Sequence, residues 1–224
     1  MGAFSESERA AVYRAIFARR DIRRYRRESV DDTVLWRILE AAHHGPSVGF
    51  MQPWNFILVR DVQVKSKVKG LFERERQAAA CFYDEPQRSA YLGFSLEGIL
   101  DAPINLCVTC DPSRGGEVLG RNSQPETDVY STCCAIENLW LAARAEGLGV
   151  GWVSILKLPH LRQILGIPPH VVPVAYLCVG YPEEFPDEPM LQSAQWRDRL
   201  PLNELVFEDR WPAPAAFERS TSSG

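Results

Sequence analysis

The chain lacks a long apolar run. Its longest strongly apolar stretch is 171–179, far short of the roughly 18 to 20 residues that a membrane helix needs. Its first charged residues, Glu6 and Glu8, are followed by no apolar block, so we expect neither a signal peptide nor a transit peptide. The sequence therefore predicts a cytoplasmic protein with no membrane partner.

Motifs for metals and nucleotides are also missing. Cys107 and Cys110 form a CxxC pair, but no second pair and no paired histidines complete a zinc set. The glycines of 147–151 follow a predicted helix and enter a predicted strand, the reverse of the order in a dinucleotide-binding fingerprint. No P-loop is present. We predict no metal site.

The composition fits a single folded domain. Of the 224 residues, 46% are apolar and 24% are charged, which is enough for a full core and excludes intrinsic disorder. The net charge of -4 argues against a general nucleic-acid binder, and the six cysteines are expected to be reduced, mostly buried thiols. We expect one domain over 1–211, including a C-terminal extension over 181–211, and then a flexible tail over 212–224.

Periodicity and capping signals predict an α+β protein. Helices are expected from the capping box Ser5–Glu8, after Asp31, from about Val62, and over 87–100, 128–146 and 159–165. Strands are expected at 55–59, 104–110, 149–155 and 171–179. Because strands and helices do not alternate regularly, a doubly wound sheet is disfavoured. The helix 128–146 is apolar on nearly all sides, which is typical of a core or subunit-interface helix.

The arginine-rich segment 19–27 is the most unusual feature of the chain, with six arginines in nine residues. It is a solvated basic turn, a nucleic-acid patch or a small-anion site. Nucleic-acid patches normally belong to basic domains, whereas this chain is acidic. Arginine forks bind phosphate bidentately. Asp21 lies among these arginines, which should favour its charged form, and it is a candidate acid or base if it faces an apolar ligand.

Three further segments have the composition of ligand contacts. The loop 46–56 mixes Phe, Met and Trp with Ser, Gly and Gln, so it either packs under the sheet or contacts a flat aromatic ligand with polar edges. Gly149 and Gly151 in a predicted strand indicate close approach of a ligand or of another backbone. Ser154 is an ordinary strand hydroxyl or a ligand contact. The arginine pair in 196–201 says little alone.

Together these segments resemble the nitroreductase family of FMN enzymes. The resemblance covers about 5–211 and is carried by 19–23, 46–56, 109–111, 138–147 and 149–155. It implies an α+β fold in which helices flank a central, mostly antiparallel sheet, and an intertwined homodimer with FMN at the subunit interface. The chain departs from the family pattern in 24–31, which is more basic than expected, and in the tail after Trp211.

The resemblance also implies roles for individual residues. The FMN phosphate and ribityl chain would be held by the cofactor-binding turn Arg19, Arg20, Asp21, Ile22 and Arg23, with a weaker phosphate candidate in Arg199. The flavin would be bordered by Ser47, Gly49 and, on the predicted helix 87–100, Leu96. Ser154 would hydrogen-bond the flavin or an oxygenated intermediate. Asp21 would be the catalytic base or acid, because ordinary members have Ser or Thr there and a hydroxyl cannot act as a base near neutral pH.

The closest branch of the family implies an unusual reaction. Reduced FMN, supplied by a separate NAD(P)H:flavin reductase, reacts with O2 and is fragmented to 5,6-dimethylbenzimidazole, the lower ligand of cobalamin, and erythrose 4-phosphate. The flavin is then a substrate and no metal is needed. Two alternatives stay open: an NAD(P)H-dependent FMN nitro- or quinone reductase, for which Phe50 and Met51 leave little room over the flavin, and a non-enzymatic module binding FMN or nucleic acid.

Overall fold

The computed structural model describes residues 2–213. Contacts within the chain divide it into two compact units, Met1–Phe185 and Pro186–Gly224, and the first contains the sheet. In the described part of the second unit lie α7 (Met190–Ser193) and the 3-10 helix Leu202–Glu204. Residues 214–224 of the predicted tail lie outside the described part. Between residues 2 and 213, no helix combines the length and apolar character needed to cross a bilayer.

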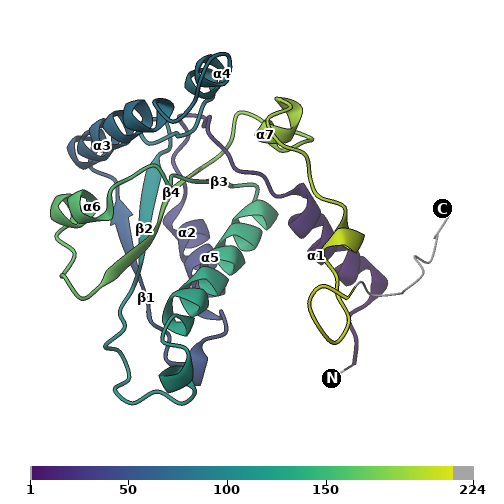
Figure 1. The fold of residues 1–224 in the computed structure, drawn as a ribbon. Helices are drawn as coiled ribbons and strands as arrows, with labels where there is room; N and C mark the ends of the chain where they lie inside the picture. The colour runs from purple at the N-terminus through teal and green to yellow at the C-terminus, as the bar shows by residue number, and fades with distance from the viewer. Residues whose placement is uncertain (1, 214–224) are drawn as a thin grey trace. The chain divides into compact units, whose positions relative to one another are not determined.

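The first unit is built on an antiparallel sheet. Its strands are β1 (Trp54–Val59), β2 (Ile104–Cys110), β3 (Gly149–Trp152) and β4 (Val172–Gly180). Among the described residues they form one sheet in the order β1-β2-β4-β3, and all neighbours are antiparallel. Together with the flanking helices, this sheet confirms the predicted α+β class (Figure 1).

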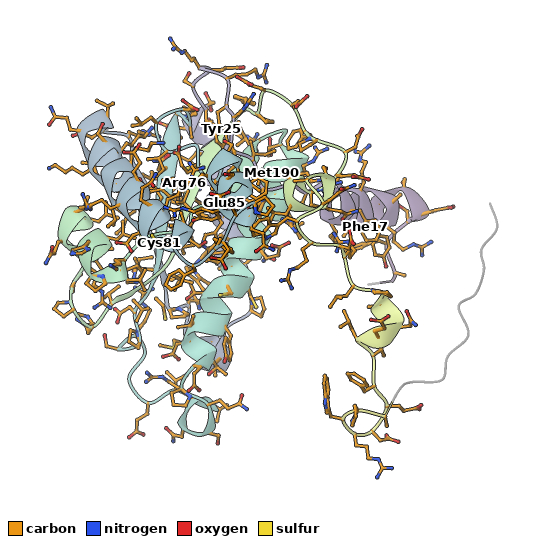
Figure 2. The ribbon with its side chains drawn as sticks, turned by 45° about the horizontal axis from the view of Figure 1, so that its top comes forward. Phe17, Tyr25, Arg76, Cys81, Glu85 and Met190 are labelled. Carbon is orange, nitrogen blue, oxygen red and sulfur yellow. The ribbon has the colours of Figure 1, made fainter. Side chains whose placement is uncertain are left out.

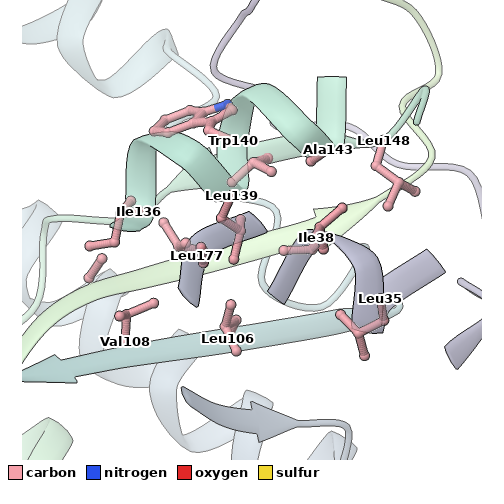
Figure 3. Packing of buried hydrophobic residues seen from close by; sticks show 14 of the residues in the cluster. Leu35, Ile38, Leu106, Val108, Ile136, Leu139, Trp140, Ala143, Leu148 and Leu177 are labelled. Carbon is pink, nitrogen blue, oxygen red and sulfur yellow. The ribbon is translucent and has the colours of Figure 1, made fainter. Parts of the chain in front are cut away.

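Helices cover both faces of the sheet because alternate strand residues point to opposite sides. Leu106 and Val108 of β2 belong to the apolar cluster formed with α2 (Asp32–His43) and α5 (Thr127–Ala145), as Figure 3 shows. Cys107, between them, belongs to the cluster formed with α3 (Val62–Ala80) and α6 (Leu158–Leu165). All seven residues of β2 are buried, which makes it a central strand.

The helix α1 (Glu6–Ala18) begins as predicted but lacks a buried face. Ser5 Oγ accepts from the Glu8 amide, and the Glu8 carboxylate accepts from the Ser5 amide, so the capping box is confirmed. Yet every side chain of α1 is at least partly exposed, including the apolar Ile16 and Phe17. The apolar side chains of α1 are therefore not buried by the rest of the first unit.

The predicted helix 87–100 is wrong in length, because α4 ends at Gly93 (Gln87–Gly93). Arg76 of α3, which is labelled in Figure 2, donates to the carbonyl oxygens of Leu92 (2.6 Å) and Phe94 (2.7 Å), and so satisfies the end of the helix from outside it. Leu96 is consequently in the loop before β2 and not on a helix. The strand predicted over 149–155 is also shorter, ending at Trp152.

The cysteines are unpaired but less buried than expected. Cys81 and Cys134 are exposed and Cys133 is half-buried. Burial raises the pKa of Cys107 and of Cys178 to about 12, so neither is a thiolate at neutral pH. The residues from 2 to 213 contain no cluster of three His, Cys, Asp or Glu side chains placed to hold a metal.

Candidate functional site

The arginine turn, residues 19–23, follows α1 and lies along the free edge of β3. Asp21 pairs with Val150 in an isolated parallel bridge, and the Ile22 amide donates to the Val150 carbonyl at 2.9 Å. The turn is thus held by sheet-type hydrogen bonds. A solvated basic turn, one of the alternatives that the sequence left open for 19–27, therefore does not describe residues 19–23, whereas Arg24, Arg26 and Arg27 beyond them are exposed.

Two glycines of β3 allow this close approach. A Cβ at Gly151 would lie 2.0 Å from the Ile22 carbonyl oxygen, and one at Gly149 would lie 2.7 Å from Ile22 Cγ1. Of the two explanations for glycine in this strand, approach of another backbone is therefore the one observed. Any larger residue at 151 would push the arginine turn off the sheet.

Tyr25 is a buried residue that the sequence reasoning missed. Its hydroxyl lies 2.9 Å from the carbonyl oxygens of Ile22 and Cys178, either of which can accept its proton. Its ring occupies the space that a Cβ at Gly98 would fill, at 2.6 Å, and lies 3.2 Å from a Cβ at Gly180. The tyrosine therefore fixes the C-terminal end of the arginine turn against the sheet.

The Asp21 carboxylate is fixed at both oxygens. Oδ1 accepts from the Trp152 amide at 2.9 Å and Oδ2 lies 2.5 Å from Arg23 Nη2. Arg23, the Trp152 amide and Arg19 lower the pKa of Asp21, but desolvation by burial outweighs them and raises it above 3.8. The neighbouring arginines favour the charged form of Asp21, as predicted, and the net rise of its pKa comes from burial, which the sequence did not predict. Since 45% of the side chain stays exposed, water limits the shift.

The arginines of the turn offer donors to an anion. Arg23 is 14% exposed, and its buried Nη1 finds no hydrogen-bond acceptor within residues 2–213. Arg19 stacks over the Trp140 ring, with its Cζ 4.9 Å from the ring centroid, and its Nε lies 3.6 Å from Glu137 Oε1. Arg20 donates to the carbonyl oxygens of Phe17 and Arg19, each at 2.7 Å. Three arginines within five residues suit a phosphate-bearing ligand.

Within the second candidate segment, 46–56, residues 47–52 form a loop that we call the strained loop for its backbone angles. This loop is anchored on α5 at a different place from the arginine turn. The Val48 amide donates to Ser131 Oγ at 3.0 Å. Trp140, which contacts the arginine turn, lies nine residues further along the same helix, about 13 Å at 1.5 Å per residue. Ser47 and Gly49 are therefore anchored away from the arginine turn of their own chain.

The backbone of the strained loop is unusual. Gly49, Phe50 and Gln52 have φ of 52°, 55° and 50°, in the left-handed region that non-glycine residues seldom adopt. Ser47 Oγ accepts from the Gln52 amide at 3.1 Å and keeps its own proton for another acceptor. Phe50 is 83% exposed, whereas Met51 is buried and cannot crowd a ligand as predicted.

The remaining candidates are spread over the chain. Ser154 lies two residues beyond Trp152, whose amide holds Asp21, and it is exposed. Leu96 is half-buried against the α3 side of the core. Arg199 belongs to the second unit and is exposed there. Of the predicted set, the first unit thus gathers Asp21, Ile22 and the arginines 19, 20 and 23 at one sheet edge, and Ser154 follows two residues after the end of β3.

Comparison with known proteins identifies the class. The family model described as the Nitroreductase family matches residues 16–181, and the chain belongs to that family of oxidoreductase enzymes. The family predicted from the sequence is thereby confirmed.

Curated relatives and solved structures agree with this class. A 5,6-dimethylbenzimidazole synthase of Rhodospirillum rubrum is 41% identical over 184 residues, covering 82% of this chain and 87% of the relative. One of Rhodobacter capsulatus is 40% identical over 200 residues, covering 88% and 96%. The structure of iodotyrosine deiodinase bound to FMN and 3-iodo-L-tyrosine has a TM-score of 0.69 at 22% identity, covering 84% and 96%. At that identity the structure supports the fold alone.

Proposed function

We propose that the protein binds reduced FMN and, with O2, fragments it to 5,6-dimethylbenzimidazole and erythrose 4-phosphate. The observation that carries the proposal is a carboxylate, Asp21, which the Trp152 amide and Arg23 hold within a turn of three arginines. The names of the two relatives at about 40% identity support the benzimidazole product. Dimethylbenzimidazole is the lower ligand of cobalamin, so the protein would serve cobalamin synthesis.

In this proposal the arginine turn binds the phosphate and ribityl part of the flavin. Arg23, which is 14% exposed, would add its positive charge to the anion site, while its Nη1 is covered by the chain beside Gly151. Arg19 and Arg20 would add charge-assisted hydrogen bonds. Reduced FMN would supply the electrons that activate O2, so the reaction requires no metal.

Asp21 would hold and move a proton during the fragmentation. Its raised pKa brings the carboxyl closer to the operating pH, which favours proton transfer in both directions. The Trp152 amide and Arg23 each occupy one lone pair of a different carboxylate oxygen, so the proton would move at a remaining lone pair of the carboxylate. Ser154 would donate its hydroxyl to the flavin or to an oxygenated intermediate near the end of β3.

A second copy of the chain would complete the site. The apolar residues Val12, Tyr13, Ile16 and Phe17 of α1 are exposed and suit a subunit interface. The strained loop and the arginine turn are anchored about 13 Å apart on α5, so Ser47 and Gly49 of one copy would face the arginine turn of the other. Light scattering after size exclusion should give twice the chain mass; a monomer that makes product would contradict this arrangement.

A conventional FMN reductase is the second candidate. The NADPH:FMN oxidoreductase of Vibrio harveyi complexed with NAD+ shares the fold, with a TM-score of 0.64 at 17% identity covering 90% of this chain and 78% of that one. The burial of Met51 removes one of the two side chains expected to exclude a nicotinamide. In this alternative NAD(P)H reduces bound FMN directly and no separate flavin reductase is needed.

One experiment separates the two. The protein is incubated anaerobically with chemically reduced FMN, air is admitted, and the products are separated and identified by mass. The proposal expects dimethylbenzimidazole and erythrose 4-phosphate without added NAD(P)H. Recovery of reoxidised FMN alone, with rapid NADPH oxidation on a nitroaromatic substrate, would instead establish the reductase.

A further inference from the structure

We propose that Trp140 of α5 is a positioning residue that sets the arginine turn for the flavin phosphate. This inference rests on the proposed function. Trp140 Nε1 donates to the Arg20 carbonyl oxygen at 3.3 Å, and the Arg19 guanidinium lies over the indole ring. The same ring lies 6.4 Å, centroid to centroid, from that of Trp152, whose amide holds Asp21. One buried side chain thus contacts Arg19 and Arg20 and packs beside the residue that holds Asp21.

The contact with the Trp140 ring orders the Arg19 side chain and leaves its N–H groups able to bind an anion. An arginine side chain has many rotamers, and ordering it on binding costs free energy. Stacking on the indole occupies the flat face of the guanidinium and leaves its edge N–H groups free for an anion. Glu137, one turn before Trp140 on α5, supports the same orientation from 3.6 Å. Arg19 is therefore pre-oriented before any ligand arrives.

The indole hydrogen bond fixes the turn's backbone. The Arg20 carbonyl belongs to the peptide that joins Arg20 to Asp21, so its orientation sets the direction in which both side chains leave the chain. A phenylalanine at position 140 would keep an aromatic ring but lose this donor. The Arg20 carbonyl would then be free to rotate toward water, and the turn would lose a fixed geometry.

A purely structural role would have a different signature. Trp140 also packs in the α5 cluster with Leu139 and Ala143, so its replacement lowers stability in either case. Loss of packing weakens every ligand equally. Loss of arginine positioning weakens a ligand with a phosphate, FMN, but spares riboflavin, which has the same ring system and no phosphate.

The test is the ratio of FMN to riboflavin affinity in Trp140→Phe, measured by titrating oxidised flavins into the folded protein. We expect the dissociation constant for FMN to rise about fivefold, the loss of one neutral hydrogen bond, and that for riboflavin to stay unchanged. Trp36→Phe is the matched control, because Trp36 is 69% exposed on α2 and should change neither constant. An unchanged ratio in Trp140→Phe would overturn the inference.

A second variant covers the case in which Trp140→Phe does not fold. Arg19→Lys keeps the charge, leaves Trp140 in place and removes the planar group that stacks on it. It should lower the FMN-to-riboflavin affinity ratio, and a wild-type ratio would overturn the inference. Failure of the proposed function is distinguishable, because the wild-type protein would then bind neither flavin or would form no product from reduced FMN.

Discussion

The arginine turn and the strained loop are held in opposite ways. The turn is fastened to the rest of its unit by Tyr25, Trp140 and the β3 backbone, and Ile22 at its centre is buried. The strained loop has its own internal hydrogen bonds, left-handed backbone angles and an exposed Phe50 at its tip. The turn is thus preorganised within one chain, whereas the loop has strained backbone angles that a partner surface would stabilise in the proposed dimer.

The largest effect is expected from removing the charge inside the turn. Asp21→Asn should reduce dimethylbenzimidazole formation by about 100-fold or more, the usual size of a general acid–base contribution. FMN binding should be retained, because the amide oxygen can still accept from the Trp152 amide. Product is measured in a single turnover of reduced FMN. Asp32→Asn, at the exposed start of α2, is the control; product at the normal rate from Asp21→Asn would refute the base assignment.

The fastening of the turn can be broken at Gly151. Gly151→Ala should destabilise the protein by about 3 kcal/mol or more. The added Cβ would lie 2.0 Å from the Ile22 carbonyl oxygen, and neither atom can move without moving the backbone that carries it. Gly70→Ala in α3 meets its nearest atom at 4.0 Å and should stabilise by up to about 1 kcal/mol. Urea unfolding measures both. Equal stability of the two variants would show that the turn does not depend on this contact.

The electrostatics of the turn can be separated from its fastening. Arg23 lowers the pKa of Asp21 against the desolvation that raises it, so Arg23→Gln should raise that pKa further. If Asp21 acts as a base, the acid limb of the pH profile lies above 3.8 and moves to higher pH in this variant. The rate of product formation is measured at saturating reduced FMN across pH, with Arg9→Gln as the control. If the acid limb of the pH profile does not move in Arg23→Gln, the titration of Asp21 does not cause that limb.

The strain of the loop predicts the smallest effect. Phe50→Gly should be more stable than Phe50→Ala by about 1 kcal/mol, because glycine adopts the left-handed region at no steric cost. The same pair at Phe82, which is exposed but outside that region, should show the reverse order. Urea unfolding of the four variants tests this. The same order at both sites would mean that the loop carries no strain.

Much of the fold could be predicted from short stretches of sequence. The capping box at Ser5 and the strand pattern of 104–110 each depend on residues close together in the chain, and the structure has both as predicted. The end of α4 was missed because it is satisfied by Arg76, a side chain from another helix. No pattern within 87–100 reports that contact.

The candidate site was predictable in part for the same reason. The arginines and Asp21 are adjacent in the chain, so their composition identified the turn. Tyr25 was missed because its role depends on Gly98, Gly151 and Gly180, which are far apart in sequence and meet only around its ring. The net rise in the Asp21 pKa was missed because desolvation depends on the whole fold.

The central claim is that reduced flavin is consumed and not recycled. It is tested most directly by following the visible absorbance of oxidised FMN after O2 is mixed with the protein and an equal amount of reduced FMN. The account predicts that the recovered absorbance falls short of the starting FMN by an amount proportional to the dimethylbenzimidazole formed. With Asp21→Asn the absorbance should return fully. Full return of the FMN absorbance with the wild-type protein would contradict the account.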